Sequence, residues 1–149
     1  MIKRNLIFII FLSIFAPATA FSSTLKCRVS DRFYDDNLQV TTMYYFHLNG
    51  NQGVIKMDGV YNDNGSKEVI SREVRVAVES EKGLMTLESR QIIRFPVETI
   101  SNEKMSHQFP DLFSQEGRTL SMTISPVDNG SYILSYNAKS IFYCKDASG

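Results

Sequence analysis

The sequence lacks the motifs that most often mark an enzyme. Its 149 residues contain no G-x-S-x-G nucleophile elbow, no H-E-x-x-H zinc motif and no phosphate-binding loop. They include two histidines, His47 and His107, and neither has a nucleophile or a carboxylate partner that the sequence makes evident. We therefore expect no enzymatic activity, no catalytic residue and no cofactor.

An excess of charge of either sign is also missing. Lys and Arg total 16, and Asp and Glu total 16. Without Lys3 and Arg4, which belong to the N-terminal segment described next, the balance becomes 14 minus 16, or −2. General nucleic-acid binding needs a basic field, so the composition argues against it. The composition also gives no reason to invoke an anionic membrane surface.

The N-terminal apolar run is short for a membrane-spanning helix, which needs roughly 20 residues. Lys3 and Arg4 precede a run from Leu6 to Phe15, which is apolar except for Ser13. Small residues follow in Ala18-Thr19-Ala20, at the positions that a signal peptidase reads. This order of charged, apolar and small residues is typical of a secretory signal peptide.

We therefore predict a signal peptide at residues 1–20 and a single β domain at residues 21–149. The mature protein is expected in the periplasm. The alternative is a retained anchor in the inner membrane with the domain facing the periplasm, because residues 16–21 extend the apolar run.

Cysteine is scarce, and the two cysteines lie at opposite ends of the mature chain. Cys27 comes just after the signal segment, and Cys144 just before the C-terminus. Export favours a disulfide between them, with two free buried thiols as the alternative. We expect no metal site, because two sulfurs more than a hundred residues apart, with two histidines, do not have the spacing of metal ligands.

The stretch from Leu38 to Phe95 alternates apolar and polar residues in four runs separated by turn residues, which predicts a strand meander. Gly59 within the second run suggests a bulge or bend. Asp31–Asn37 is expected to be a loop, and Ile93 to share a face with Met85 and Leu87. About eight strands follow from the whole chain: 25–30, 38–48, 54–61, 69–79, 84–93, 118–125, 132–136 and 140–144.

One segment, Pro96–Gly117, has no alternation and is long for a hairpin loop, so we expect a short helix in it. Pro110 before Asp111–Phe113 suits one helical turn. The predicted fold is therefore all-β: an antiparallel meander that stays a curled sheet or closes into a small barrel, with one short helical insertion. Closure would place the first and last strands side by side, joined by the disulfide.

A ligand cavity is the main candidate for a site, since eight-stranded barrels can hold one small ligand. Arg72 is the single charged member of an apolar face. It is either paired with an inward Glu or with backbone carbonyls, or it binds an anionic headgroup at the rim. Tyr44, Tyr45 and Phe46 either pack in the core or line the cavity. The candidate pocket residues are Tyr44, Phe46, Arg72, Val74, Leu87 and Met122.

The order of segments resembles the FidL-like family of small exported enterobacterial proteins. The quoted stretches are "LKCRVS", "GVIKMDGVY", "ISREVRV", "FPDLF" and the C-terminal "GSYILSYNAKSIFYC". Genes of that family tend to lie beside membrane regulators similar to ToxR. The resemblance implies a role like that of ToxS: binding the regulator's periplasmic domain, with a lipocalin-like barrel that takes a bile-salt-like or fatty-acid-like ligand.

Two functions therefore stand as expectations. The first is a periplasmic co-regulator bound to a ToxR-like membrane regulator. The second is an independent periplasmic binding module, either a small-ligand carrier or a protein inhibitor. A carrier is expected to be a closed monomer, whereas a co-regulator is expected to expose a strand edge or an apolar patch for its partner.

Overall fold

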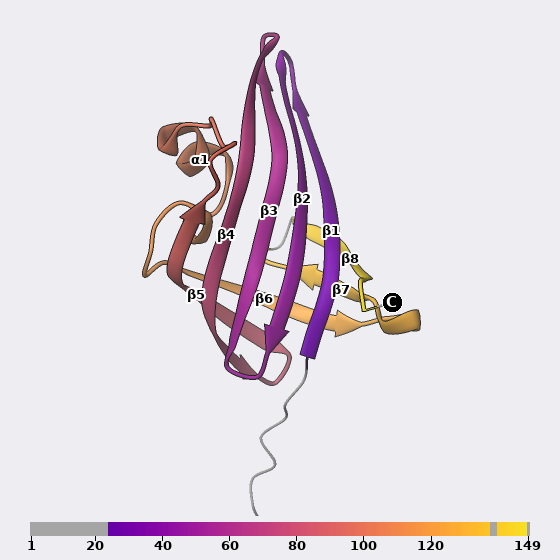
Figure 1. Cartoon of the computed structure of the whole chain (residues 1–149). Coiled ribbons are helices and arrows are strands. Elements are labelled where there is room, and N and C mark those ends of the chain that lie inside the picture. Colours follow the sequence, from indigo (N-terminus) through magenta and orange to yellow (C-terminus); the bar gives the residue numbers. More distant parts are fainter. Residues whose placement is uncertain (1–23, 138–139, 149) are drawn as a thin grey trace, which may run out of the picture.

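The alternating runs of the sequence form the strands of a closed antiparallel barrel in the computed structural model, which describes residues 24–137 and 140–148. The predicted signal peptide lies outside these described residues. Each strand pairs with its neighbours in chain order, and β8 returns to β1 (Figure 1). The small antiparallel barrel expected from the sequence is confirmed.

Five long strands come first and three shorter ones follow the helical insertion (Figure 1). The strands are β1 (Thr24–Asp35), β2 (Leu38–Asn49), β3 (Gln52–Asp63), β4 (Ser66–Glu81), β5 (Leu84–Arg94), β6 (Thr119–Pro126), β7 (Tyr132–Ser135) and β8 (Ile141–Asp146). The helical elements are α1 (Asn102–Gln108) and the 3-10 turns η1 (Asp111–Phe113) and η2 (Asp128–Gly130).

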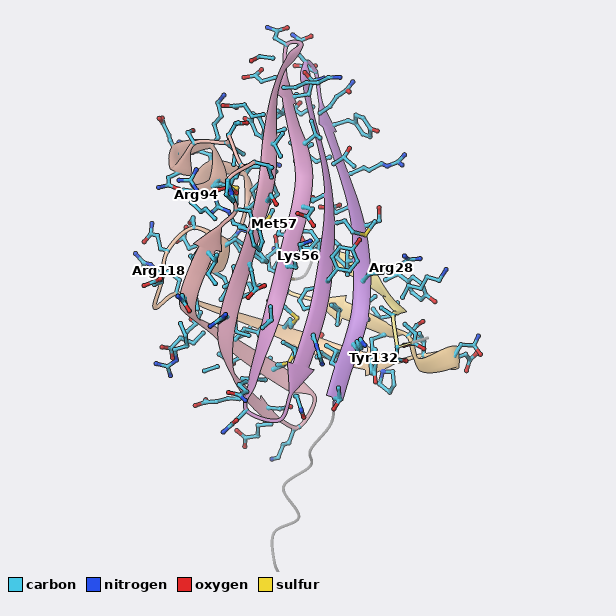
Figure 2. All side chains as sticks on the ribbon, in the orientation of Figure 1. Arg28, Lys56, Met57, Arg94, Arg118 and Tyr132 are labelled. Atoms are coloured by element: carbon cyan, nitrogen blue, oxygen red, sulfur yellow. A yellow bond between two sulfur atoms is a disulfide. The ribbon has the colours of Figure 1, made fainter. Side chains whose placement is uncertain are left out.

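The two faces of each long strand separate core from solvent. On β3, Met57 is fully buried, whereas the side chain of the adjacent Lys56 is 47% exposed (both labelled in Figure 2). This follows from the period of two in a strand. The inward face of β2 is the one predicted, with Val40, Thr42, Tyr44, Phe46 and Leu48 all buried.

The first strand is longer than the sequence suggests. The predicted loop Asp31–Asn37 is wrong, because β1 continues to Asp35 and only Asp36 and Asn37 make the turn. β1 pairs with β2 without a break from Thr24↔Asn49 to Asp35↔Leu38. Pairing along a neighbouring strand therefore overrides the weak strand propensity of these polar residues.

The register of β5 changes at a bulge that the sequence did not reveal. Arg75 pairs with Gln91, but Val76 pairs with Ser89, so one extra residue stands in β5. A one-residue shift sends every later side chain to the opposite face. The prediction that Ile93 shares a face with Met85 and Leu87 is therefore wrong, and Ile92 packs against the core instead.

The bulge suggested at Gly59 is absent from the β2–β3 pairing, which runs continuously from Leu38↔Asp63 to Asn49↔Gln52. A Cβ atom at Gly59 would collide with the carbonyl oxygen of Thr41 and crowd Thr42. Glycine is required here because the two backbones approach closely.

The segment between β5 and β6 closes one side of the barrel. It first follows the edge of β4, where the Phe95 N–H donates to the Ser71 carbonyl (3.0 Å) and the Ile100 N–H to the Val69 carbonyl (3.1 Å). α1 then begins at Asn102, is capped by the hydroxyl of Ser101, and lies beside β4 and β5 (Figure 1). We call residues 95–117 the lid. None of the described helices has the length and apolar character needed to cross a membrane.

The predicted short helix in the lid is confirmed. The turn expected after Pro110 is η1, with Pro110 as its cap rather than its first residue. Leu112 and Phe113 of this turn are buried, and so is Met105 of α1. These side chains explain why an irregular segment stays against the barrel.

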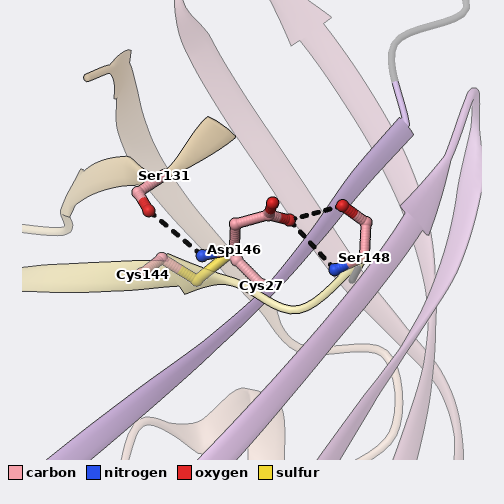
Figure 3. The surroundings of a disulfide bond; sticks show 5 residues. All are labelled: Cys27, Ser131, Cys144, Asp146 and Ser148. Carbon is pink, nitrogen blue, oxygen red and sulfur yellow. Dashed lines mark hydrogen bonds between the residues drawn. A yellow bond between two sulfur atoms is a disulfide. The ribbon is translucent and has the colours of Figure 1, made fainter. Parts of the chain in front are cut away.

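The disulfide predicted between Cys27 and Cys144 is confirmed (Figure 3). The two Cα atoms are 5.3 Å apart, and both residues are fully buried. Closely beside them, the Asp146 N–H donates to the Ser131 hydroxyl (3.1 Å). The barrel is thus closed covalently at the place where β1 meets β8.

We predict that replacing both cysteines by alanine lowers the free energy of unfolding by about 4–5 kcal/mol, the chain-entropy value for so long a loop. The sequence separation is 117 residues. Urea unfolding of the oxidised protein and of the double variant measures the difference. A reductant is expected to destabilise the native protein and to leave the variant unchanged. An unchanged urea midpoint after reduction of the native protein would contradict the prediction.

Candidate functional site: a cavity at the β1–β8 seam

The barrel closes over a very short stretch. β1 pairs with β8 only at Cys27↔Asp146 and Arg28↔Lys145, followed by one backbone hydrogen bond from Ala147 to Lys26 (3.1 Å). Beyond it, residues 29–35 of β1 pair with β2 alone, and Ile141–Tyr143 of β8 pair with β7 alone. We call this opening between two strand edges the seam.

A cavity of about 460 Å³ lies inside the seam. Its walls come from β1, β2, β6, β7, β8 and the part of the lid around η1. The walls are mostly apolar and aromatic, and they include Phe46, Phe109, Phe113, Met122, Leu134 and Phe142. The volume lies within the range of small-molecule sites.

Three of the six predicted pocket residues are at this cavity: Tyr44, Phe46 and Met122. The Tyr44 ring lies 5.5 Å from the Phe113 ring of the lid, centroid to centroid. Burial raises the pKa of the Tyr44 hydroxyl well above its usual value, so the group stays protonated. The other three predicted residues, Arg72, Val74 and Leu87, are fully buried and do not line the cavity.

Arg72 is held by a buried ion pair. Its Nε and Nη2 donate to the two carboxylate oxygens of Glu98, each at 2.7 Å, and its Nη1 donates to the Phe113 carbonyl, also at 2.7 Å. Both side chains are almost completely shielded from solvent. Of the two roles left open for Arg72, the structure shows the paired one, with no nitrogen left without an acceptor.

Glu98 joins several parts of the lid to the barrel. Besides Arg72, its carboxylate accepts from the Ser71 N–H (3.3 Å) and from Nε of Arg94. Arg94, which lies beside the lid (Figure 2), also donates to the Ile100 carbonyl at 2.9 Å. The sequence did not single out Glu98. A lone Arg on an apolar face requires an acid, but nothing in the sequence says which one.

Asp31 is the second residue that sequence reasoning missed, because it fell in the predicted loop. It is half-buried at the seam and lines the cavity. Burial raises the pKa of its carboxyl, and a backbone hydrogen bond at Arg32 partly offsets this shift. Among residues 24–137 and 140–148, the ion pairs do not include Asp31.

The outer surface of the seam carries exposed apolar groups next to cations. Ile141 is 68% exposed and Tyr143 is 55% exposed. Arg28 projects outward from β1 (Figure 2) and is directly opposite Lys145 on β8. Like charges at opposite positions repel each other. We call these four residues the seam patch.

We predict that Glu98→Ala lowers the free energy of unfolding by about 3–5 kcal/mol, because it leaves Arg72 as an unpaired buried charge. The matched control is Glu73→Ala, whose partner Arg75 is 57% exposed. An exposed pair of this kind contributes about 0–1 kcal/mol. The double variant Arg72→Met/Glu98→Leu is expected to recover most of the loss. Equal unfolding midpoints for the two Glu variants would refute the prediction.

Comparison with known proteins identifies a family. The model of the YqeJ C-terminal domain matches residues 24–144, which include strands β1 to β7, the first four residues of β8, the lid and both cysteines. No curated protein matches the chain, and no solved structure matches it. In the described ranges, no cluster of three or more His, Cys, Asp or Glu side chains is arranged to hold a metal ion. The chain belongs to the YqeJ C-terminal domain family.

Proposed function

We propose that this protein is a non-catalytic periplasmic co-regulator, which holds one small amphipathic ligand and binds the periplasmic domain of a ToxR-like membrane regulator. The observation that carries the proposal is the seam, because a ligand cavity meets there with two strand edges that pair with no other described strand. The FidL-like resemblance supplies the class of partner, and this part of the proposal is analogy.

The cavity supports the ligand part of the proposal. A barrel of eight strands is just wide enough to hold one small ligand. The apolar wall suits a hydrocarbon or ring system, and Asp31 and Tyr44 supply a few polar groups that orient it. An amphipath fits such a site better than a wholly polar metabolite does.

The seam patch supports the partner part. Free strand edges tend to pair with another chain unless they are covered. Association would remove the exposed apolar surface of Ile141 and Tyr143 from water, which favours binding. An acidic group on the partner would relieve the repulsion between Arg28 and Lys145. The disulfide supports export, because such bonds persist in oxidising compartments.

The second candidate is an independent binding module, a small-ligand carrier or a protein inhibitor. One observation favours it: the barrel is closed within a single chain, by β1–β8 pairing and by the disulfide. The two candidates share the cavity and differ at the seam patch, so they are separated by binding to a regulator.

We predict that Leu120→Trp weakens binding of a neutral fluorescent amphipath, N-phenyl-1-naphthylamine, by about tenfold or more. Leu120 lines the cavity, and the larger tryptophan ring would occupy volume that the ligand needs. The expected loss of binding free energy is of the size of an overpacking cost. Fluorescence titration measures the change. The control is Leu84→Trp, at an exposed position in β5 outside the cavity. Equal weakening by both variants, or no binding to the native protein, would refute the cavity proposal.

We predict that Ile141→Ser/Tyr143→Ser weakens co-purification with the periplasmic domain of a ToxR-like regulator from the same organism. The matched control Leu84→Ser/Val97→Ser removes two exposed apolar groups away from the seam and is expected to bind normally. Co-expression followed by size-exclusion chromatography measures the complex. A native protein that elutes as a ligand-binding monomer with no regulator bound would favour the carrier instead.

A further inference from the structure

The described residues that line the cavity are almost all uncharged. Of the described residues that line it, only Asp31 and Arg32 are ionic. Successive residues of a strand point to opposite faces. Val29, Asp31 and Phe33 share the inward face of β1, and all three line the cavity, whereas Arg32 leaves from the outward face and is exposed. The carboxylate of Asp31 is therefore the one charge on the inward face of β1 that lines the cavity.

Aromatic rings surround the same part of the cavity. Tyr44 and Tyr136 both line it, and the charge of Asp31 lies close enough to raise the pKa of Tyr44 further. The Tyr136 ring stacks on Phe142 at a centroid distance of 6.1 Å. Aromatic faces combined with a carboxylate are a favourable environment for an ammonium group, which is attracted by the ring quadrupoles and by the negative charge.

We propose that the ligand of this cavity is a cationic amphipath, with a primary or quaternary ammonium head beside Asp31 and an apolar tail between β2, β6 and β7. This inference rests on the proposed ligand-binding function and specifies the sign of the ligand's charge. The tail would contact Phe46, Met122 and Leu134, which line the cavity on those strands.

An acidic head fits the same cavity less well. Arg72, the cation expected to hold it, is fully engaged by Glu98 and Phe113 and does not reach the cavity. Arg28 and Lys145 do not line this cavity; together with Asp31 they line a second, neighbouring hollow at the seam. An anion in the cavity would face the Asp31 carboxylate, and like charges in a poorly solvated site repel strongly. Arg32, the one cation among the described residues that line the cavity, leaves β1 from the opposite face.

A half-buried carboxylate without an ion-pair partner also has a cost of its own. Desolvation raises the pKa of the Asp31 carboxyl, because burial makes its charged form less stable. A bound ammonium group offsets it by supplying the missing positive charge. Binding of an ammonium group therefore also relieves the desolvation cost of the Asp31 carboxylate.

The experiment compares three amphipaths that share a decyl tail: decyltrimethylammonium, decyl maltoside and decyl sulfate. Each displaces N-phenyl-1-naphthylamine from the full-length mature protein, at pH 7.5, at low salt and below its micelle concentration. We expect the cation to displace the probe at a concentration about tenfold or more below that of the sulfate, the scale of one desolvated cation–π contact. The neutral maltoside is expected to fall between them.

Asp31→Asn is expected to abolish the order of cation before anion and to leave displacement by the maltoside unchanged. The control is Asp35→Asn, which removes the same charge farther along the inward face of β1, where the residue is exposed and does not line the cavity. This control is expected to keep the native order. The order measured on the native protein requires no variant, so the test stands even if Asp31→Asn folds poorly.

The outcomes separate the two levels of the proposal. If neither the probe nor the maltoside binds, the cavity is not a ligand site and the proposed function fails with it. If the probe and the maltoside bind but the sulfate displaces as well as the ammonium does, the ligand site stands and the cationic ligand is refuted. An Asp31→Asn variant that keeps the native order would refute the role of Asp31.

Discussion

The closure of the barrel depends on a very short stretch of pairing between β1 and β8. β1 has 12 residues and β8 has six, yet they share two residue pairs and one disulfide. This short junction is enough to close the barrel, because the covalent bond removes much of the conformational freedom of the open chain. The same shortness leaves the rest of β1 without a partner on one side. Closure and the seam are therefore two consequences of the same short stretch of pairing between β1 and β8.

The lid depends on a different constraint, the need to neutralise a buried guanidinium. Arg72 stands on an apolar face of β4, and its charge is tolerable only with a partner. Glu98 provides that partner from the lid, and Phe113 adds a carbonyl. Because Phe113 also lines the cavity, the ion pair positions part of the cavity wall without facing a ligand. A residue that looks like a ligand-binding group is thus a structural one whose effect on the site is indirect.

The sequence predicted most of the fold and part of the site. Its alternation identified the strands and the inward faces, since Val40, Tyr44 and Phe46 recur with the period of a strand. It did not reveal the bulge in β5, because a bulge is defined by pairing with a neighbour and leaves no local pattern. It also placed Asp31 in a loop, because the polar residues around it have low strand propensity and only pairing with β2 makes them a strand.

The sequence by itself determined which side chains are apolar on which face, that two cysteines stand at the two ends of the domain, and that one arginine interrupts a buried face. These are local facts, fixed by side-chain chemistry and by the period of the backbone. Only the tertiary structure decided which acid neutralises Arg72, where β1 and β8 stop pairing, and which carboxylate faces the cavity. Those outcomes depend on contacts between residues far apart in the chain, such as Arg72 with Glu98, and many arrangements of such contacts agree with one local pattern.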